Sequence, residues 1–192
     1  SLQDMKNIVE CLNHHFPKWT ELDRFYLIIS EMLGDLFQDL ESTLDCYEEA
    51  LSVDRENLRI ISKLHTVSKE QENRELQKLY LSRMLELEKR KAIKSKYANE
   101  LAMLIRGEDL DQAVKIAYTH WKDYKTNIGL LLHLCELLRE KKQPNLAIEC
   151  LRDGLTAIKS TRLSVHEEQL DLLITEIWLK DLSRSDIAEK RL

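Results

Sequence analysis

Glycine and proline, the residues that most often interrupt regular secondary structure, are scarce in this sequence. Its 192 residues include four Gly and two Pro, whereas average usage would supply about thirteen Gly and about ten Pro. Together with the lack of runs rich in Val or Thr, this scarcity predicts long helices joined by short polar turns, and no β-sheet. Four glycines are also too few to expect a glycine-rich loop that cradles phosphate.

Membrane-spanning and secretory segments are missing as well. No apolar run approaches the roughly twenty residues that cross a bilayer, and residues 1–10 contain acids rather than an apolar signal segment. The four cysteines (Cys11, Cys46, Cys135 and Cys150) are scattered, without a CxxC motif or a His/Cys ligand pattern. We expect buried free thiols in a reducing compartment, and therefore an intracellular protein, cytoplasmic or nuclear.

Catalytic and cofactor-binding motifs are also lacking. The sequence has no GxGxxG, GxxxxGK[ST], HExxH or GxSxG pattern. His14 and His15 stand near an expected helix end, while His65, His120 and His166 each stand alone among apolar or acidic neighbours. Histidines in such settings are more often packed or solvated than catalytic, so we predict a protein that is not an enzyme and needs no metal or cofactor.

Charge is distributed unevenly along the chain, whose formal net charge is -5. Residues 1–57 contain 13 acids and 4 bases, residues 58–91 contain 5 acids and 9 bases, and residues 92–192 contain 16 of each. The acidic block followed by a basic segment has two interpretations that both stay open. In the first interpretation this charge pattern serves to recognise a partner. In the second, the charged residues only keep the outer faces of the helices solvated.

The strongest positive signal is a recurrence with a spacing close to 34 residues. Four eight-residue blocks align, with steps of 34, 36 and 34 between their first residues, Leu44, Lys78, Val114 and Ile148. The fourth and eighth places are apolar in every block: Tyr47 and Leu51, Leu81 and Leu85, Ala117 and Trp121, Leu151 and Leu155. This period predicts stacked helical pairs, because a lone pair leaves one apolar face in water. We expect Trp121, Leu151 and Trp178 in the core.

Turn and cap residues place the helices. Gly107 is expected to end one helix, and Asp109 with Gln112 forms a capping box for the next. Pro144 suits a first helical position, and Ser164 with Glu167 is a second capping box. The predicted helices cover 2–15, 22–36, 40–53, 58–69, 74–89, 93–105, 110–121, 128–140, 144–158, 164–180 and 182–192.

These helices predict one domain over residues 1–192. It begins with an extra helix or half repeat (1–19) and ends with C-terminal helices (162–192). Between them lie four helical-pair repeats, 24–57, 58–91, 94–127 and 128–161. Since the first and last pairs are incomplete, we expect a piece of a longer array.

Over residues 24–161 the pattern resembles the tetratricopeptide repeat, in a degenerate form. That family prefers small residues at three places in each repeat, and the fourth repeat has them in Cys135, Ala147 and Gly154. The second repeat instead has His65, Gln77 and Met84, and the closing proline of the family is absent throughout. The resemblance implies an all-α, right-handed solenoid of antiparallel helical hairpins.

The resemblance also implies a function and a binding surface. Such proteins serve as interaction modules, scaffolds or adaptors in multiprotein complexes, and bind a peptide or partner helix along the first helices of the hairpins. The fourth repeat would contribute Leu132 and Arg139 to this surface, and the Lys/Asn set that clamps chaperone C-termini in one branch of the family is missing. The other side chains implied in the groove are Phe25, Ile29, Met32, Arg59, Lys63, Thr66, Asn99, His133 and Glu136. Their order, from apolar to basic and polar, predicts a ligand with a hydrophobic anchor and an acidic stretch.

Two alternatives remain beside that hypothesis. The basic run over residues 89–96 could bind RNA, although only Tyr97 adjoins it as a stacking platform and the net charge is negative. We favour the other interpretation of this run, a solvated turn between repeats. Self-association through the terminal helices is also expected, because exposed ends of such arrays can stack on their own copies.

Overall fold

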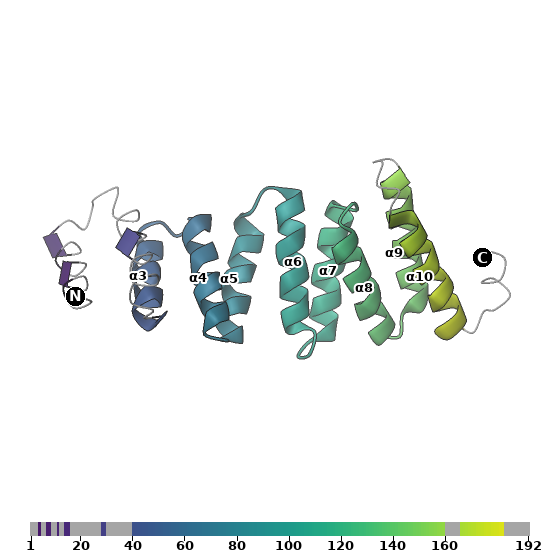
Figure 1. Cartoon of the computed structure of the whole chain (residues 1–192), viewed down its shortest axis with the longest axis horizontal. Coiled ribbons are helices and arrows are strands. Elements are labelled where there is room, and N and C mark those ends of the chain that lie inside the picture. The colour runs from purple at the N-terminus through teal and green to yellow at the C-terminus, as the bar shows by residue number, and fades with distance from the viewer. Residues whose placement is uncertain are drawn as a thin grey trace. The chain divides into compact units, whose positions relative to one another are not determined.

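The computed structural model describes residues 40–159 and 166–182, and eight residues nearer the N-terminus: Asp4, Asn7, Ile8, Cys11, His14, His15, Ile28 and Ile29. Within the two continuous ranges every regular element is an α-helix. The helices are α3 (Leu40–Val53), α4 (Leu58–Glu70), α5 (Arg74–Leu87), α6 (Lys91–Ile105), α7 (Leu110–Asp123), α8 (Ile128–Glu140), α9 (Pro144–Lys159) and α10 (Glu167–Lys180) (Figure 1). This part of the chain therefore has the all-α class that the sequence predicted.

The chain divides into two compact units, residues 1–87 and residues 88–192. In the first unit α4 and α5 form a helical hairpin, and α3 packs against α4. In the second unit α6 with α7, and α8 with α9, form two further hairpins, and α10 packs against α9 (Figure 1). The single domain predicted over residues 1–192 stays a prediction.

Short polar side chains cap the first turns of several helices. The Asn57 side chain accepts hydrogen bonds from the second and third backbone amides of α4, at 3.1 and 3.3 Å. Asn127 accepts one from the third amide of α8 at 3.1 Å. Asp109 accepts a hydrogen bond from the backbone amide of Gln112 at 2.8 Å, which is one half of the predicted capping box, while the Asp109 amide donates to the Ile105 carbonyl. Since these amides have no partner within the helix, each cap stabilises its helix start by about 1 kcal/mol.

The break between α5 and α6 lies two residues earlier than predicted. The buried carboxylate of Glu88 accepts hydrogen bonds from the backbone amide and the guanidinium of Arg90, at 2.8 to 2.9 Å. These hydrogen bonds, with that from the Arg90 side chain first, lower the pKa of Glu88 to about 2. The chain therefore leaves the helix at Leu87 and enters the next at Lys91.

Several predicted features fall outside the described residues. Most of the helices predicted at 2–15, 22–36 and 182–192 lie there. Ser164 of the second capping box also lies there, and α10 begins at Glu167 after His166, whose side chain makes no capping hydrogen bond.

The three large core residues chosen from the sequence are buried. Trp121, Leu151 and Trp178 expose between 0 and 6% of their surface. Among the recurring apolar places of the second helices, Leu85 is only half-buried, and the other described members are buried. The 34-residue recurrence therefore marks residues that are packed between neighbouring helices of each unit.

The positions that depart from the small-residue pattern are nevertheless packed. His65, Gln77 and Met84 are all buried in the first unit. The side-chain amide of Gln77 donates a hydrogen bond to the carbonyl of Ser68 at 3.2 Å, so this buried polar group is satisfied. The degenerate repeat thus keeps the hairpin by filling the space with larger side chains.

The cysteines follow the prediction at three positions. Cys46, Cys135 and Cys150 are buried free thiols, whereas Cys11 is exposed, so the prediction was wrong for Cys11. Burial raises the pKa of the Cys150 thiol to about 12 and keeps it protonated at neutral pH.

Two hairpin turns use a residue other than glycine in the left-handed backbone conformation. Glu72 after α4 has φ 54°, and Lys142 after α8 has φ 60°. In the second turn the amide of Lys142 donates to the Arg139 carbonyl at 2.9 Å, and that of Gln143 to the Leu138 carbonyl at 2.8 Å. This bonding is the Schellman motif, whose left-handed position is usually glycine because a Cβ is strained there.

Replacing Lys142 with glycine is therefore expected to stabilise the second unit. The substitution removes the strain of a left-handed L-residue, which exceeds the extra entropy of glycine in the unfolded chain, for a net gain of about 0.5–1 kcal/mol. Urea denaturation of the whole chain measures it. The neighbouring substitution Gln143→Gly relieves no such strain and should lower stability, and equal effects of both would contradict the explanation.

Gly154 in α9 lies where three helices approach closely. A Cβ built on Gly154 would stand 2.4 Å from Leu131 Cδ2 of α8 and 3.8 Å from Leu170 Cδ1 of α10. Leu131 and Leu170 are fully buried. The missing side chain of Gly154 therefore allows α8 and α10 to pack against the same point of α9.

Gly154→Ala is expected to destabilise the protein by about 1–3 kcal/mol, because the added methyl forces Leu131 out of its packed position. The better helix propensity of alanine, about 1 kcal/mol, offsets only part of this loss. Gly129→Ala is the matched control, since the nearest atom to its Cβ would be Asn127 Oδ1 at 3.6 Å. Thermal unfolding should show a lower midpoint for the first variant alone.

Candidate functional site

The groove residues predicted in the first unit lie in several environments. Phe25 and Met32 fall outside the described residues, and Ile29 exposes 5% of its surface, which leaves little area for a partner. The three predicted residues of α4, Arg59, Lys63 and Thr66, reach the surface, with Lys63 half-buried. The Thr66 hydroxyl donates to the carbonyl of Ser62 at 3.0 Å. These positions do not form a described cavity.

In the second unit the structure brings predicted site residues together. The Nδ1 atom of His133 on α8 lies 2.8 Å from the side-chain oxygen of Asn99 on α6. Glu136, one turn further along α8, pairs with Arg106 of α6 at 3.5 Å. Arg106 also donates to Glu140 at 2.7 Å. We call these contacts the α6/α8 polar ladder; they join the first helices of two consecutive hairpins.

His133 is the buried member of this ladder. It exposes 8% of its surface, and its Nε2 atom has no hydrogen-bond partner. Burial lowers the pKa of His133; the Arg106 charge lowers it further, and Glu136 opposes the shift. The neutral ring with a proton on Nδ1 therefore fits the site, because the Nδ1–H group then donates a hydrogen bond to the side-chain oxygen of Asn99.

This arrangement makes the second unit less stable in mild acid. The pKa of His133 is lower in the folded than in the unfolded chain, so its contribution is present above the unfolded pKa, about 6.5. It is lost as the pH falls toward the folded value, because the unfolded state then binds more protons. We expect His133→Gln to lose less stability than the natural chain between pH 7.5 and pH 5.5 in urea denaturation. An equal loss in both proteins would contradict this assignment.

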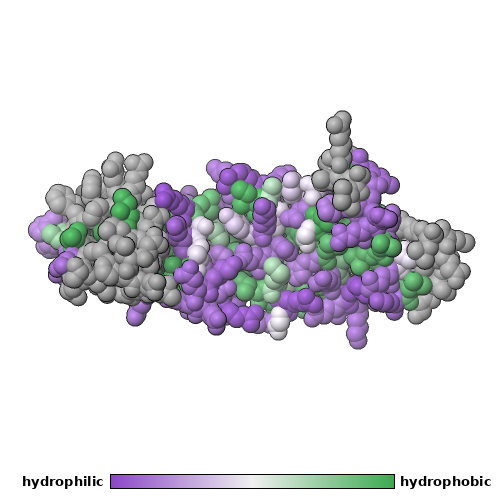
Figure 2. All heavy atoms as spheres, viewed as in Figure 1, coloured by the Kyte–Doolittle hydropathy of each residue, from purple (hydrophilic) through white to green (hydrophobic). Residues whose placement is uncertain are grey.

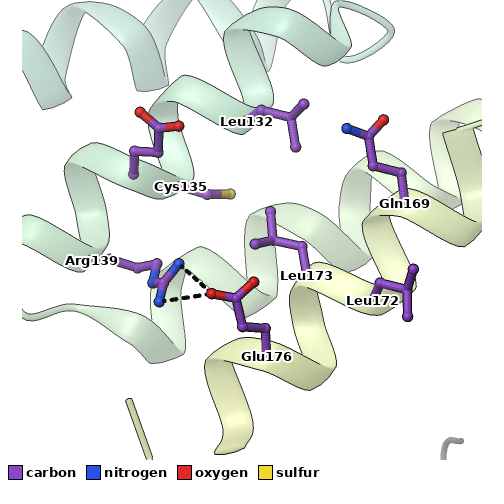
Figure 3. Close-up of a pocket in the computed structure, with 8 residues that line it drawn as sticks. Leu132, Cys135, Arg139, Gln169, Leu172, Leu173 and Glu176 are labelled. Atoms are coloured by element: carbon purple, nitrogen blue, oxygen red, sulfur yellow. Dashed lines mark hydrogen bonds and ion pairs between the residues drawn. The ribbon is translucent and has the colours of Figure 1, made fainter. Parts of the chain in front are cut away.

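A hollow of about 440 Å³ lies between α8 and α10. We call it the α8/α10 groove. In Figure 3 the Cys135 side chain of α8 and the Leu173 side chain of α10 point into the space between the two helices. Leu172 lies at the rim and exposes 57% of its surface. The complete lining comprises Leu132, Cys135, Glu136, Arg139, Gln169, Leu172, Leu173 and Glu176.

Ion pairs close one end of this groove. The Arg139 guanidinium contacts Glu176 of α10 at 3.5 Å (Figure 3) and also pairs with Asp181, just beyond α10. The hydrogen bonds with Asp181 and the nearby carboxylates raise the pKa of Arg139. Because Arg139 is committed to two acids, it orients the groove wall rather than offering a free cation.

The sequence identified only one wall of this groove. Leu132, Glu136 and Arg139 of α8 were implied by the fourth repeat, whereas the α10 residues were missed. The signal on α10 was an apolar count too large for one face. Leu170, Ile174, Ile177 and Trp178 are buried, Leu173 is half-buried at the edge of that face, and Leu172 points away from it and is exposed.

A second hollow, of about 450 Å³, lies between α3 and α5 in the first unit. Its lining mixes leucines with Glu48, Arg55, Tyr80 and Arg83. The Tyr80 hydroxyl donates to Glu48 at 3.0 Å, and the Arg83 guanidinium to the carbonyl of Arg55 at 3.0 Å. These internal bonds occupy much of its polar surface.

The basic run over residues 89–96 does not form an aromatic platform. Arg90 is bound to Glu88, and Tyr97 is half-buried, with a pKa raised first by burial. Lys89, Lys91 and Lys96 are exposed. The structure therefore provides no stacking surface in this run that would favour RNA.

On the visible surface hydrophobic residues lie in several groups between hydrophilic ones, including a group over the C-terminal helices (Figure 2). Among the described residues, no helix combines the length and apolarity that a bilayer crossing needs.

Comparison with solved structures identifies the fold. The MamA protein is 13% identical, with a TM-score of 0.63 over 90% of this chain and 89% of that one. PilF of Pseudomonas aeruginosa is also 13% identical, over 98% of this chain and 90% of that one, with a TM-score of 0.45. The fold is tetratricopeptide-like. No family model and no curated protein matches the sequence, so the fold inferred from degenerate repeats is confirmed by structural likeness alone.

Proposed function

We propose that this chain is a non-enzymatic interaction module, a scaffold or adaptor that binds a peptide or partner helix in the α8/α10 groove. The observation that carries the proposal is the open hollow of about 440 Å³, with an apolar floor and the exposed Leu172 at its rim. Tetratricopeptide-like folds generally bind protein partners rather than catalyse reactions.

The chemistry of the groove supports binding more than catalysis. Burial raises the pKa of the Cys135 thiol, so a reactive thiolate is disfavoured at neutral pH. The Arg139 guanidinium is held by Glu176 and Asp181. Apolar side chains with a few fixed polar groups are typical of a surface that receives a partner side chain.

The α6/α8 polar ladder explains why the groove lies between α8 and α10. Between α6 and α8 the facing side chains bond to one another, as in the Asn99–His133 contact. Between α8 and α10 the contacts gather around Arg139 at one end, and the rest of the space is hollow. A partner can therefore occupy the second space without breaking existing hydrogen bonds.

Binding at Arg59, Lys63 and Thr66, self-association through the terminal helices, and an intracellular location stay predictions. The RNA alternative has no observation in its favour beyond the exposed lysines of residues 89–96.

The groove proposal is tested by comparing two exposed leucines. Leu172→Arg places a charge at the rim of the groove, whereas Leu79→Arg places it on α5 of the first unit, where Leu79 is 52% exposed. We expect proteins captured by the natural chain from a nuclease-treated cell extract to fall at least about tenfold with Leu172→Arg, since a partner that covers the apolar side chains of the groove would also have to cover the new charge, which is unfavourable.

The same proteins should remain bound to Leu79→Arg. Thermal unfolding of both variants checks that each is folded. If Leu172→Arg retains every partner, the binding surface lies elsewhere in the molecule.

A further inference from the structure

The first helices of the three described hairpins, α4, α6 and α8, and the helix α10 that follows them differ in charge. Helix α4 contains two lysines, one arginine and one glutamate, and α6 contains three lysines and one glutamate. Each of these helices therefore has a formal charge of +2. Helix α8 contains two glutamates and one arginine, for a formal charge of -1. Helix α10 contains four acids and one lysine, for a formal charge of -3. The two helices that form the groove are therefore the acidic ones.

The cations near the groove offset this charge only in part, because three of them, Arg106, Arg139 and Lys180, pair with four carboxylates, those of Glu136, Glu140, Glu176 and Asp181. Arg139 lies between Glu176 and Asp181, and Arg106 contacts Glu136 as well as a second glutamate of α8. Each arginine thus faces two carboxylates. Lys180, the cation of α10, also pairs with Glu176, at 3.3 Å.

The acidic groups of the groove wall remain accessible. The Glu136 side chain is 63% exposed, and the Glu176 side chain is 40% exposed. Between these carboxylates lie the apolar side chains of the floor, including Leu132 and Leu173. The groove therefore has an apolar floor, and each of its walls carries a carboxylate whose charge is only partly neutralised.

We propose that the α8/α10 groove binds a cationic amphipathic protein segment. Its apolar side chains enter between Leu132, Leu172 and Leu173, and its Lys or Arg side chains approach Glu136 and Glu176. This inference rests on the proposed function and adds the chemistry of the partner. The proposed ligand is basic, whereas the sequence predicted an acidic stretch that would pair with the basic residues of the earlier hairpins. The difference arises because the groove lies between the acidic helices.

The charge match favours this occupant over others. An acidic peptide would meet the carboxylates of both walls, and like charges across an interface oppose binding. A purely apolar peptide would fill the floor but add no opposite charge to the incompletely neutralised carboxylates of Glu136 and Glu176. A segment with both features satisfies the floor and the walls at once.

The test begins with selection from a random peptide library displayed on phage, using the immobilised whole chain at about 50 mM salt. Peptides that bind are synthesised and their Kd values are measured by fluorescence anisotropy against four proteins. These are the natural chain, Leu172→Arg, the double variant Glu136→Gln/Glu176→Gln, and the control Glu108→Gln/Glu149→Gln. The control removes the same charge from exposed positions outside the groove.

We expect the selected peptides to carry leucine-like residues with excess Lys or Arg, and to bind Leu172→Arg poorly. The Glu136→Gln/Glu176→Gln variant should weaken binding about three- to thirtyfold, and the control less than about twofold. Glu136→Gln alone, which keeps the Arg139–Glu176 pair, should show part of the loss. Raising the salt to about 300 mM should weaken binding to the natural chain, because it screens exposed charges.

The other outcomes separate the two proposals. Neutral or acidic peptides that need Leu172 would keep the groove as the binding site and overturn its cationic specificity. Cationic peptides weakened equally by both double variants would show attraction to net charge only, which also overturns it. Peptides indifferent to Leu172→Arg, or no selected peptide at all, would overturn the groove itself as the binding site.

Discussion

The groove depends on the close approach of three helices at one glycine. Gly154 of α9 has no side chain, and Leu131 of α8 and Leu170 of α10 occupy the space around it. These leucines are adjacent in sequence to Leu132, and near Leu172 and Leu173, which line or flank the groove on its open side. The two walls are therefore held apart at a fixed spacing by what is packed behind them. A side chain at Gly154 would shift the walls before it touched any partner.

Two consecutive spaces between first helices differ because their facing residues differ. Asn99 and His133 stand at equivalent places of consecutive repeats and bond to each other. One period beyond His133 is Glu167, the first residue of α10, so this place lies at the very start of that helix. The ion pairs between α8 and α10 gather around Arg139 at the other end, and a hollow lies between the two helices beside them.

The fold could be read from the sequence because the recurring apolar residues are the ones that pack. Trp121, Leu151 and Trp178 are buried because stacked helices bury their apolar faces, which is the argument by which they were predicted to lie in the core. The groove could be read only in part, since its α10 wall lies beyond the last full repeat and has no periodic partner. The left-handed turn at Lys142 was also missed. The usual sequence signal for this conformation is glycine, and here the position is occupied by lysine. Local exceptions of this kind leave no trace in a periodic pattern.

In α10 the side chains that pack in the core and the side chains that carry charge are different residues, so the charge of a helix can change while its packing is kept. In α10 the buried face of Leu170, Ile174 and Ile177 supplies the stability of the hairpin stack. The acids Glu168 and Glu176 lie toward solvent, where their exchange alters the core little. The earlier first helices keep the same apolar spacing with the opposite charge. An array can thus retain one packing of its helices while the charge between its hairpins changes, and the α8/α10 groove lies between two acidic helices.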